Sequence, residues 1–338
     1  MLVNINTKPN SWRAFMLSAR PKTLAGAAVP VIIGIAYALN TSGFDAFRDN
    51  WHGIVVAVLC MLFALVMQVD ANFANDYFDF IMGRDNENSL DPQHACQQGL
   101  VTLKGMRFAI AITTALAICL GLGILYIVYL TQPNYIPTIT ILAVGALCLA
   151  FCFLYSLCMA QLALGDLCVV VFFGIIPVYF TAYVMMVTVP SAFYFLDPVA
   201  MAGVEEQTSI INNIDWRLFA LGVSCGLIID TLLVVNNYRD IEDDINNHKC
   251  TVATLLGKEK TEYFYLTIAT LALVIVLICY GWIPLNIFLT FPVYFLYIGT
   301  WQKMRRIGQG GELNAVLHNT SRNMLIYGIL TAILILVN

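Results

Sequence analysis

Long apolar runs alternate with shorter polar segments along the whole chain. Nine of these runs are of roughly membrane-crossing length, at residues 22–40, 53–80, 106–130, 136–158, 162–189, 215–238, 264–281, 284–301 and 322–338. A helix needs about 20 mostly apolar residues to cross the hydrocarbon core of a bilayer. The pattern therefore predicts an all-α, polytopic membrane protein with nine transmembrane helices. The polar, amphipathic segment at residues 11–22 (SWRAFMLSARPK) indicates an interfacial helix and not a cleavable signal.

Composition and charge support this interpretation and give it an orientation. The 338 residues are 60% hydrophobic and 11% charged, whereas a soluble domain carries about 25% charged residues. With the N-terminus in the cytoplasm, all of the 17 Lys and Arg residues except Arg48 and Arg217 fall on the cytoplasmic side. This positive-inside bias predicts a cytoplasmic N-terminus and an outside C-terminus. The ten cysteines follow neither a disulfide nor a zinc spacing, so we interpret them as small packing residues.

Two apolar runs end in similar acidic segments. The run at 53–80 ends in NDYFDFIMGRD (75–85), and the run at 215–238 ends in NNYRDIEDD (236–244). At a constant separation, the paired residues are Asn75 with Asn236, Tyr77 with Tyr238, and Asp79 with Asp240. The match predicts a single domain built from two pseudo-repeated halves, about 11–158 and 162–335, with a site where they meet.

The acidic residues repeat with helical spacing. On helices they form two polar stripes, Asn72, Asn75, Asp76 and Asp79 on one and Asn236, Asp240 and Asp243 on the other, with Asp244 at the edge. Carboxylate and amide oxygens are the ligands that Mg²⁺ prefers, and Mg²⁺ usually shares them with substrate phosphates. A single Asp or Asn at a helix end is more often a cap. Two matched stripes instead predict Mg²⁺ ions that bind a diphosphate, with Lys104, Arg239 and Lys249 adding positive charge.

Several stretches together resemble the UbiA superfamily of intramembrane aromatic prenyltransferases. They are ARPKTL (19–24), ANDYFDF with GRDNEN (74–88), QQGLVT (97–102), LGD with FFGIIPV (164–178), and NNYRDIEDD with TVATLLG (236–257). The flanking residues are most similar to the branch that prenylates 1,4-dihydroxy-2-naphthoate in menaquinone biosynthesis. Where the family commonly has Gly-Glu, this chain has Gly165 and Asp166.

The resemblance implies a fold, a reaction and a site. The helices would surround a central cavity under a cytoplasmic cap, in the cytoplasmic (inner) membrane of a bacterium. Magnesium, for which Mn²⁺ could substitute, would bind a polyprenyl diphosphate. The prenyl group would pass to the aromatic acid with loss of CO₂, giving demethylmenaquinone. Membrane lipid is an expected partner, while nucleic acid and partner proteins are not.

The resemblance also assigns roles to individual residues. The expected metal ligands are Asp76, Asp79, Asp85, Asp240 and Asp244, and all of these except Asp85 are also expected to be catalytic. Diphosphate contacts are expected from Asn72, Asn75, Lys104, Asn236, Arg239 and Lys249. Tyr155 and Asp166 are candidates for contact with the allylic cation or the acceptor.

Other functions remain open from the sequence. The acidic motifs would equally serve another acceptor, such as 4-hydroxybenzoate or a haem- or chlorophyll-type molecule. A cation-coupled transporter is an alternative from another class, but its carboxylates would lie at the midplane and not at helix ends. A non-catalytic scaffold would leave the acidic stripes unexplained. Asp70 and Asp230 lie more than two helical turns deeper and could bond a neighbouring helix or touch the acceptor.

Overall fold

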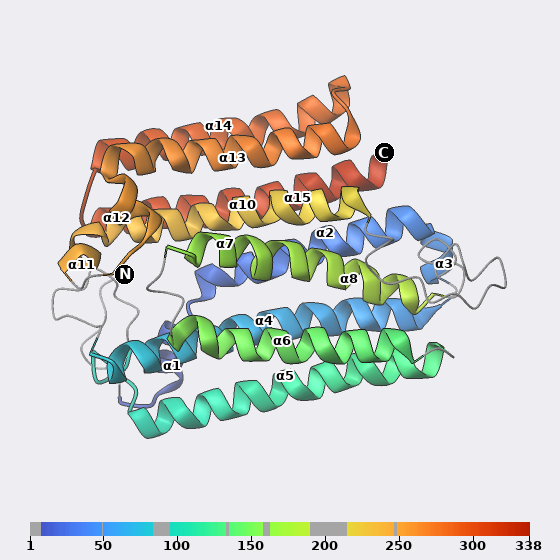
Figure 1. The fold of residues 1–338 in the computed structure, drawn as a ribbon, viewed down its shortest axis with the longest axis horizontal. Helices are drawn as coiled ribbons and strands as arrows, with labels where there is room; N and C mark the ends of the chain where they lie inside the picture. Colours follow the sequence, from blue (N-terminus) through green and yellow to red (C-terminus); the bar gives the residue numbers. More distant parts are fainter. Residues whose placement is uncertain are drawn as a thin grey trace.

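The chain folds into a bundle of long helices that run along one common axis (Figure 1). The structure is a computed structural model and describes residues 8–48, 50–83, 95–132, 135–157, 163–189, 215–246 and 249–338. The long helices are α2 (Leu24–Ser42), α4 (Trp51–Ile81), α5 (Leu103–Thr131), α6 (Ile136–Leu157), α10 (Trp216–Arg239), α13 (Lys258–Tyr280), α14 (Pro284–Ile307) and α15 (Asn314–Val337). One further continuous helical stretch consists of α7 (Gly165–Val169), the π-helical segment η3 (Val170–Ile175) and α8 (Ile176–Val187). Within these ranges there is no strand, which confirms the all-α prediction.

Each predicted apolar run lies on one of these helices. Eight helices of the described part are long and apolar enough to cross a membrane, which confirms a polytopic membrane protein. The run predicted at 284–301 lies on α14, a helix of 24 residues that is not among those eight. That the chain crosses the membrane nine times therefore stays a prediction, which depends on whether α14 crosses.

Short helices cover the two ends of the bundle. The end on the left of Figure 1 carries α1 (Trp12–Ser18), α11 (Ile241–Asn246) and α12 (Val252–Leu256). Two 3₁₀ turns, η1 (Pro21–Thr23) and η6 (Gly311–Leu313), directly precede α2 and α15. At the opposite end α3 (Phe44–Arg48) connects α2 to α4. The predicted interfacial segment thus forms a helix, α1, whose N-cap is Ser11.

Close helix packing depends on glycine at one contact. A Cβ atom on Gly226 of α10 would lie 2.6 Å from the Cα of Val170, and one on Gly174 would lie 2.5 Å from backbone atoms of Gly226. Small residues let two helix backbones approach closely inside a membrane, where dispersion replaces the hydrophobic effect as the attraction. The π-helical segment η3 therefore packs directly against α10.

Buried polar side chains also join the helices. Asp70 of α4 accepts hydrogen bonds from the hydroxyls of Thr113 and Thr114 of α5, the latter at 2.8 Å. Ser224 of α10 and Tyr327 of α15 are 2.6 Å apart through their hydroxyls. Of the two roles left open for Asp70, the structure shows the hydrogen bond to a neighbouring helix.

Candidate active site

Both acidic segments lie at the same end of the bundle. Helices α4 and α10 both run from the right to the left of Figure 1 and end beside α1, α11 and α12. The first predicted stripe lies on the last turns of α4. The second is divided between two helices, because α10 carries Asn236 and ends at its C-cap Asp240, while Asp243 and Asp244 lie on α11. Asp85 and the side chain of Tyr155 fall outside the described residues. Because both acidic segments lie at this end of the bundle, they can contribute to one site.

Asp76 of the first segment is completely enclosed. Its Oδ2 accepts a hydrogen bond from the Ser18 hydroxyl at 2.6 Å and one from the Ala95 amide at 3.0 Å. Its Oδ1 accepts from the Cys96 amide at 3.2 Å. The side chain has no exposed surface. In this arrangement Asp76 ties α1 and the segment that starts at residue 95 to the end of α4. No pattern in the sequence marks Ser18 as its partner.

Asn72 lies one turn before Asp76 and makes a similar connection. Its Nδ2 donates to the Ala19 carbonyl at 2.8 Å and to the Thr23 hydroxyl at 3.0 Å. Its Oδ1 accepts from the Gln68 amide at 3.2 Å. Asn72 therefore holds the ARPKTL stretch against α4, and its polar atoms are already occupied by protein groups.

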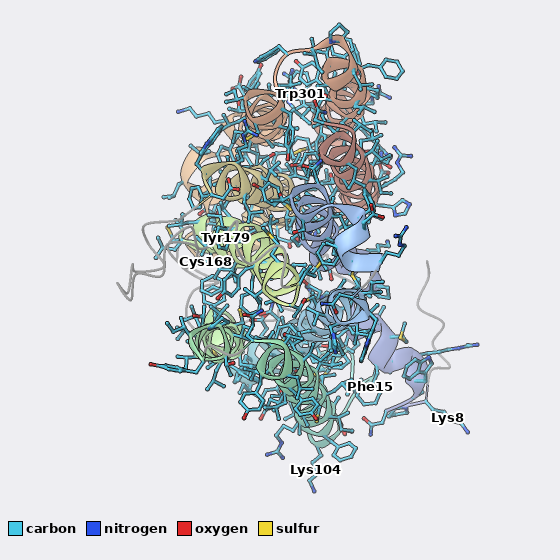
Figure 2. All side chains as sticks on the ribbon, turned by 90° about the vertical axis from the view of Figure 1, so that its right-hand side faces the viewer. Lys8, Phe15, Lys104, Cys168, Tyr179 and Trp301 are labelled. Carbon is cyan, nitrogen blue, oxygen red and sulfur yellow. The ribbon has the colours of Figure 1, made fainter. Side chains whose placement is uncertain are left out.

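Asn75 and Asp79 are the half-buried members of the first stripe. They are the described members of that stripe with side-chain surface still accessible at this end of the bundle. Lys104, expected to contact the diphosphate, is exposed. Figure 2 shows it at the lower edge of the molecule with its side chain directed away from the helices. The structure thus separates Lys104 from the second acidic segment.

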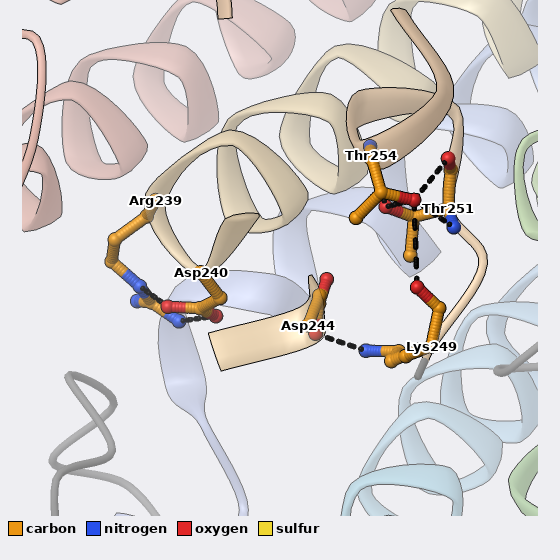
Figure 3. Close-up of polar contacts among 6 residues, drawn as sticks. All are labelled: Arg239, Asp240, Asp244, Lys249, Thr251 and Thr254. Atoms are coloured by element: carbon orange, nitrogen blue, oxygen red, sulfur yellow. Dashed lines mark hydrogen bonds and ion pairs between the residues drawn. The ribbon is translucent and has the colours of Figure 1, made fainter. Parts of the chain in front are cut away.

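Asp240 of the second segment forms a two-pronged ion pair with the residue before it. Arg239 donates from Nε to Oδ1 at 2.7 Å and from its NH2 nitrogen to Oδ2 at 2.6 Å (Figure 3). The remaining terminal nitrogen of Arg239 donates to Oδ1 of Asn314 at 2.8 Å. The Asp240 side chain keeps 27% exposure, whereas that of Arg239 has 2%. Asp240 is therefore accessible and held in one orientation.

Asp244 is paired more loosely, with Lys249. Lys249 Nζ lies 3.3 Å from Asp244 Oδ1, and the Lys249 amide donates to the Asp244 carbonyl at 2.8 Å. The segment that follows Lys249 is held by a capping box, in which the side chains of Thr251 and Thr254 each bond the other residue's backbone amide (Figure 3). Burial raises the pKa of the Asp244 carboxyl, while the charge of Lys249 opposes this shift. Asn236 of α10 and Asp243 of α11, the other members of the second stripe, are half-buried.

The donor set suits Mg²⁺ that is bound together with a phosphate. In the described ranges no three His, Cys, Asp or Glu side chains are grouped to hold a metal alone. Mg²⁺ does not need such a group, because it keeps several waters and takes one or two carboxylates plus substrate oxygens. Oδ2 of Asp244 is buried and has no hydrogen-bond partner among the described residues. A buried carboxylate oxygen without a partner is a suitable ligand for a hard cation.

An apolar cavity begins close to the first segment. It has a volume of about 270 Å³ and lies between α2, α4, α5, α6, η3 and α8. Pro30, Phe63, Leu149 and Phe180 are among the apolar side chains of its wall. Gln68 is one of its few polar lining residues and is hydrogen-bonded to Asn72, one turn further along α4. The cavity thus lies in the apolar part of the bundle, about one helical turn of α4 before Asn72.

The remaining candidates lie deeper in the bundle. Asp166 at the start of α7 and Asp230 on α10 are both buried, with 8% and 2% exposure. Each has an Oδ1 without a hydrogen-bond partner in the described part of the chain. Asp166 does not line the apolar cavity. Its predicted contact with an acceptor stays a prediction.

Known proteins share both the sequence pattern and the fold. The UbiA prenyltransferase family matches residues 27–318. The 1,4-dihydroxy-2-naphthoate octaprenyltransferase of Mycobacterium leprae is 28% identical over 333 residues, covering 95% of this chain and 96% of the relative. The Haemophilus influenzae enzyme of the same name is 28% identical over 271 residues, covering 79% and 76%. A UbiA homolog from Archaeoglobus fulgidus, solved bound to GPP and Mg²⁺, has a similar fold with a TM-score of 0.56 at 11% identity, covering 96% of this chain and 100% of that one. The chain belongs to the UbiA prenyltransferase family and is a multi-span membrane prenyltransferase.

Proposed function

We propose that this prenyltransferase moves a polyprenyl group from its allylic diphosphate to 1,4-dihydroxy-2-naphthoate with loss of CO₂, giving the quinol (dihydroxy) form of demethylmenaquinone. The observation that carries the proposal is the pair of acidic helix ends at one end of the bundle, beside an apolar cavity. The two naphthoate octaprenyltransferases that align over most of the chain support the choice of acceptor.

The polar end would hold the diphosphate with Mg²⁺. Asp79, Asp240 and Asp244 present carboxylate oxygens there, and Asp76 and Asp85 are the further ligands expected from the sequence. Bound Mg²⁺ supplies Lewis-acid chemistry, because it neutralises charge on the departing diphosphate. The amides of Asn75 and Asn236, which are half-buried, would hydrogen-bond phosphate oxygens.

Lys249 would add positive charge for the same ligand. Its side chain is 33% exposed and its ion pair with Asp244 is long, at 3.3 Å. A phosphate oxygen can therefore compete with Asp244 for the partly exposed Lys249 side chain. We expect Lys249 to move from Asp244 to the diphosphate when substrate binds, which would leave both Asp244 oxygens for the cation.

The apolar cavity would take the start of the prenyl chain. A hydrocarbon tail placed there is removed from the polar end, and each buried CH₂ group contributes about 0.8 kcal/mol. Gln68 marks the boundary, since it lines the cavity and is hydrogen-bonded to Asn72 of the first stripe. The prenyl tail would then lie in the cavity beside Gln68, and the diphosphate would lie about one helical turn further along α4.

The proposed reaction needs no covalent bond between the protein and a substrate. The bond between the allylic carbon and the bridging oxygen breaks, and its electron pair leaves with the diphosphate. The electron-rich ring carbon attacks the allylic carbon, and the ring carboxylate leaves as CO₂ while its bonding electrons restore the aromatic ring. Tyr155 and Asp166 stay our candidates for contact with the cation and the acceptor.

We place the acidic end at the cytoplasmic face of a bacterial inner membrane, with the N-terminus inside and the C-terminus outside.

One experiment tests the proposal. Purified protein in detergent is given Mg²⁺, an allylic polyprenyl diphosphate and a panel of aromatic acids, and the products are identified by mass. We expect prenylation of 1,4-dihydroxy-2-naphthoate with one CO₂ released per prenyl group transferred. A product that retains the carboxylate, or preferred use of 4-hydroxybenzoate, would overturn the assignment of acceptor.

A further inference from the structure

The guanidinium group of Arg239 is held on two sides at the second acidic segment. One side faces both carboxylate oxygens of Asp240, at 2.6 and 2.7 Å. The other side donates to Oδ1 of Asn314 at 2.8 Å. The Arg239 side chain has 2% exposure, so water does not replace these contacts. The group is fixed by protein atoms and is not directed into open space.

Asn314 is well placed to fix the arginine because its own backbone is fixed. It is the first residue of α15 and directly follows the 3₁₀ turn η6, whose Leu313 is completely buried. A planar guanidinium presents its donors in a rigid fork. Holding one nitrogen at Asn314 therefore sets the plane of the other two, and with it the orientation of the Asp240 carboxylate.

The end of α10 is fixed independently of Asn314. The Tyr238 hydroxyl donates to Glu262 of α13 at 2.8 Å, and Arg305 of α14 donates to the other carboxylate oxygen of Glu262 at 3.0 Å. Loss of the Asn314 amide would thus leave the helix end in place and release chiefly the guanidinium. This separation lets the role of Asn314 be tested without unfolding the site.

The two cations of the second segment differ in their mobility. Lys249 is 33% exposed and makes one long contact to Asp244. Arg239 is buried and donates at least three hydrogen bonds, to Asp240 and Asn314 among the described residues. A cation that must pass to an incoming phosphate needs freedom to move, and Arg239 lacks this freedom. The sequence pattern alone assigned both residues to the diphosphate.

We propose that Arg239 is the permanent counter-ion of Asp240 and that Asn314 is a positioning residue, which acts through Arg239 to aim the Asp240 carboxylate at the bound metal–diphosphate. The inference rests on the proposed function, because it assigns Asp240 to that ligand. In this arrangement Lys249 is the mobile cation and Arg239 the fixed one. The link extends the site to α15, a helix that carries none of the acidic residues.

Thermal unfolding of the full chain in detergent tests the link. The melting temperature is followed as Mg²⁺ is titrated at a fixed concentration of inorganic pyrophosphate, since a ligand that binds the folded state stabilises it. For Asn314→Ala we expect the half-saturating Mg²⁺ concentration to rise about threefold to tenfold, because Arg239 loses one hydrogen bond and only part of that free energy is transmitted to Asp240. Asn314→Asp keeps an oxygen acceptor for Arg239 and should restore the parental value to within about twofold.

Asn323→Ala is the matched control. Asn323 is also a buried amide on α15, and it bonds the Leu296 carbonyl at 3.1 Å and the Thr300 hydroxyl at 2.9 Å on α14. Its loss should lower the melting temperature without ligand but leave the half-saturating Mg²⁺ concentration unchanged.

The outcomes separate the two proposals. If the parental protein shows no stabilisation by Mg²⁺ with pyrophosphate, the proposed metal–diphosphate site itself fails. If the parental protein is stabilised and Asn314→Ala matches it, the positioning role fails alone. The role also fails if Asn314→Asp is as weak as Asn314→Ala, or if Asn323→Ala shifts the titration equally, because a packing role for Asn314 would then explain the data.

Discussion

Replacing Asp76 with Asn should loosen the segment that starts at residue 95. The carboxylate accepts three hydrogen bonds, two at Oδ2 and one at Oδ1. An Asn side chain keeps one acceptor oxygen and turns an NH₂ group toward the other donor. Each hydrogen bond to a charged group contributes about 1.5–3 kcal/mol. Loss of one such bond corresponds to roughly 10- to 150-fold faster opening of the protected amides.

Hydrogen exchange at the Ala95 and Cys96 amides measures this opening directly. Peptides that cover these residues are followed by mass spectrometry in the parental protein and in the Asp76→Asn and Ser18→Ala variants. Ser18→Ala removes one donor and leaves both amide bonds, so its effect should be smaller. Asp70→Asn is the matched control, because Asp70 is also a buried, hydrogen-bonded carboxylate of α4 but its partners lie on α5.

Unchanged exchange in Asp76→Asn would refute the anchoring role of this carboxylate. A second comparison separates that role from metal binding. When Mg²⁺ and pyrophosphate are added to the parental protein, an anchoring Asp76 keeps its three contacts, and exchange at the two amides should stay constant or slow. Faster exchange on addition would mean that Asp76 leaves these amides for the metal, as the sequence pattern first suggested.

Three further predictions follow from the same contacts. EDTA should abolish turnover, and added Mg²⁺ or Mn²⁺ should restore it; full activity in the chelator would contradict the metal site. Asp244→Asn should reduce kcat on the order of 10²-fold, by analogy with removal of a charge that acts at the transition state. Hydrogen exchange in the segment that begins at Lys249 should not change. A near-parental rate would remove Asp244 from the site. Thr113→Val combined with Thr114→Val should destabilise the protein by about 3 kcal/mol or more in detergent, because Asp70 stays buried without these donors; unchanged thermal inactivation would show that Asp70 has other partners.

The helices could be predicted because the bilayer imposes a simple rule on the sequence. A spanning segment must bond its own backbone and must be apolar over about 20 residues. These requirements are local, so runs such as 106–130 and 215–238 can be read directly and both lie on helices. α14 shows the limit of the rule, because its apolar run at 284–301 forms a helix that is not among the eight of the described part that are long and apolar enough to cross a membrane.

The partners of the acidic side chains could not be predicted, because they lie far away in the sequence. Ser18 and Asp76 are 58 residues apart, and Arg239 and Asn314 are 75 apart. Neither Ser18 nor Asn314 stands in a pattern that marks it as a partner of a carboxylate. Only the packing of α1 beside α4, and of α15 beside α10, brings these groups into contact.

The two acidic segments match in sequence but differ in their surroundings, and this difference bears on the mechanism. Tyr77 is half-buried beside Phe78, whereas the matching Tyr238 is buried and bonded to Glu262. The first segment uses its most buried carboxylate, Asp76, to accept neutral donors. The second segment has an arginine bound to Asp240, so a positive charge offsets part of its negative charge. A cation bound between the two ends would therefore experience an uneven field, because Arg239 offsets the charge of Asp240 whereas Asp76 accepts hydrogen bonds from neutral groups.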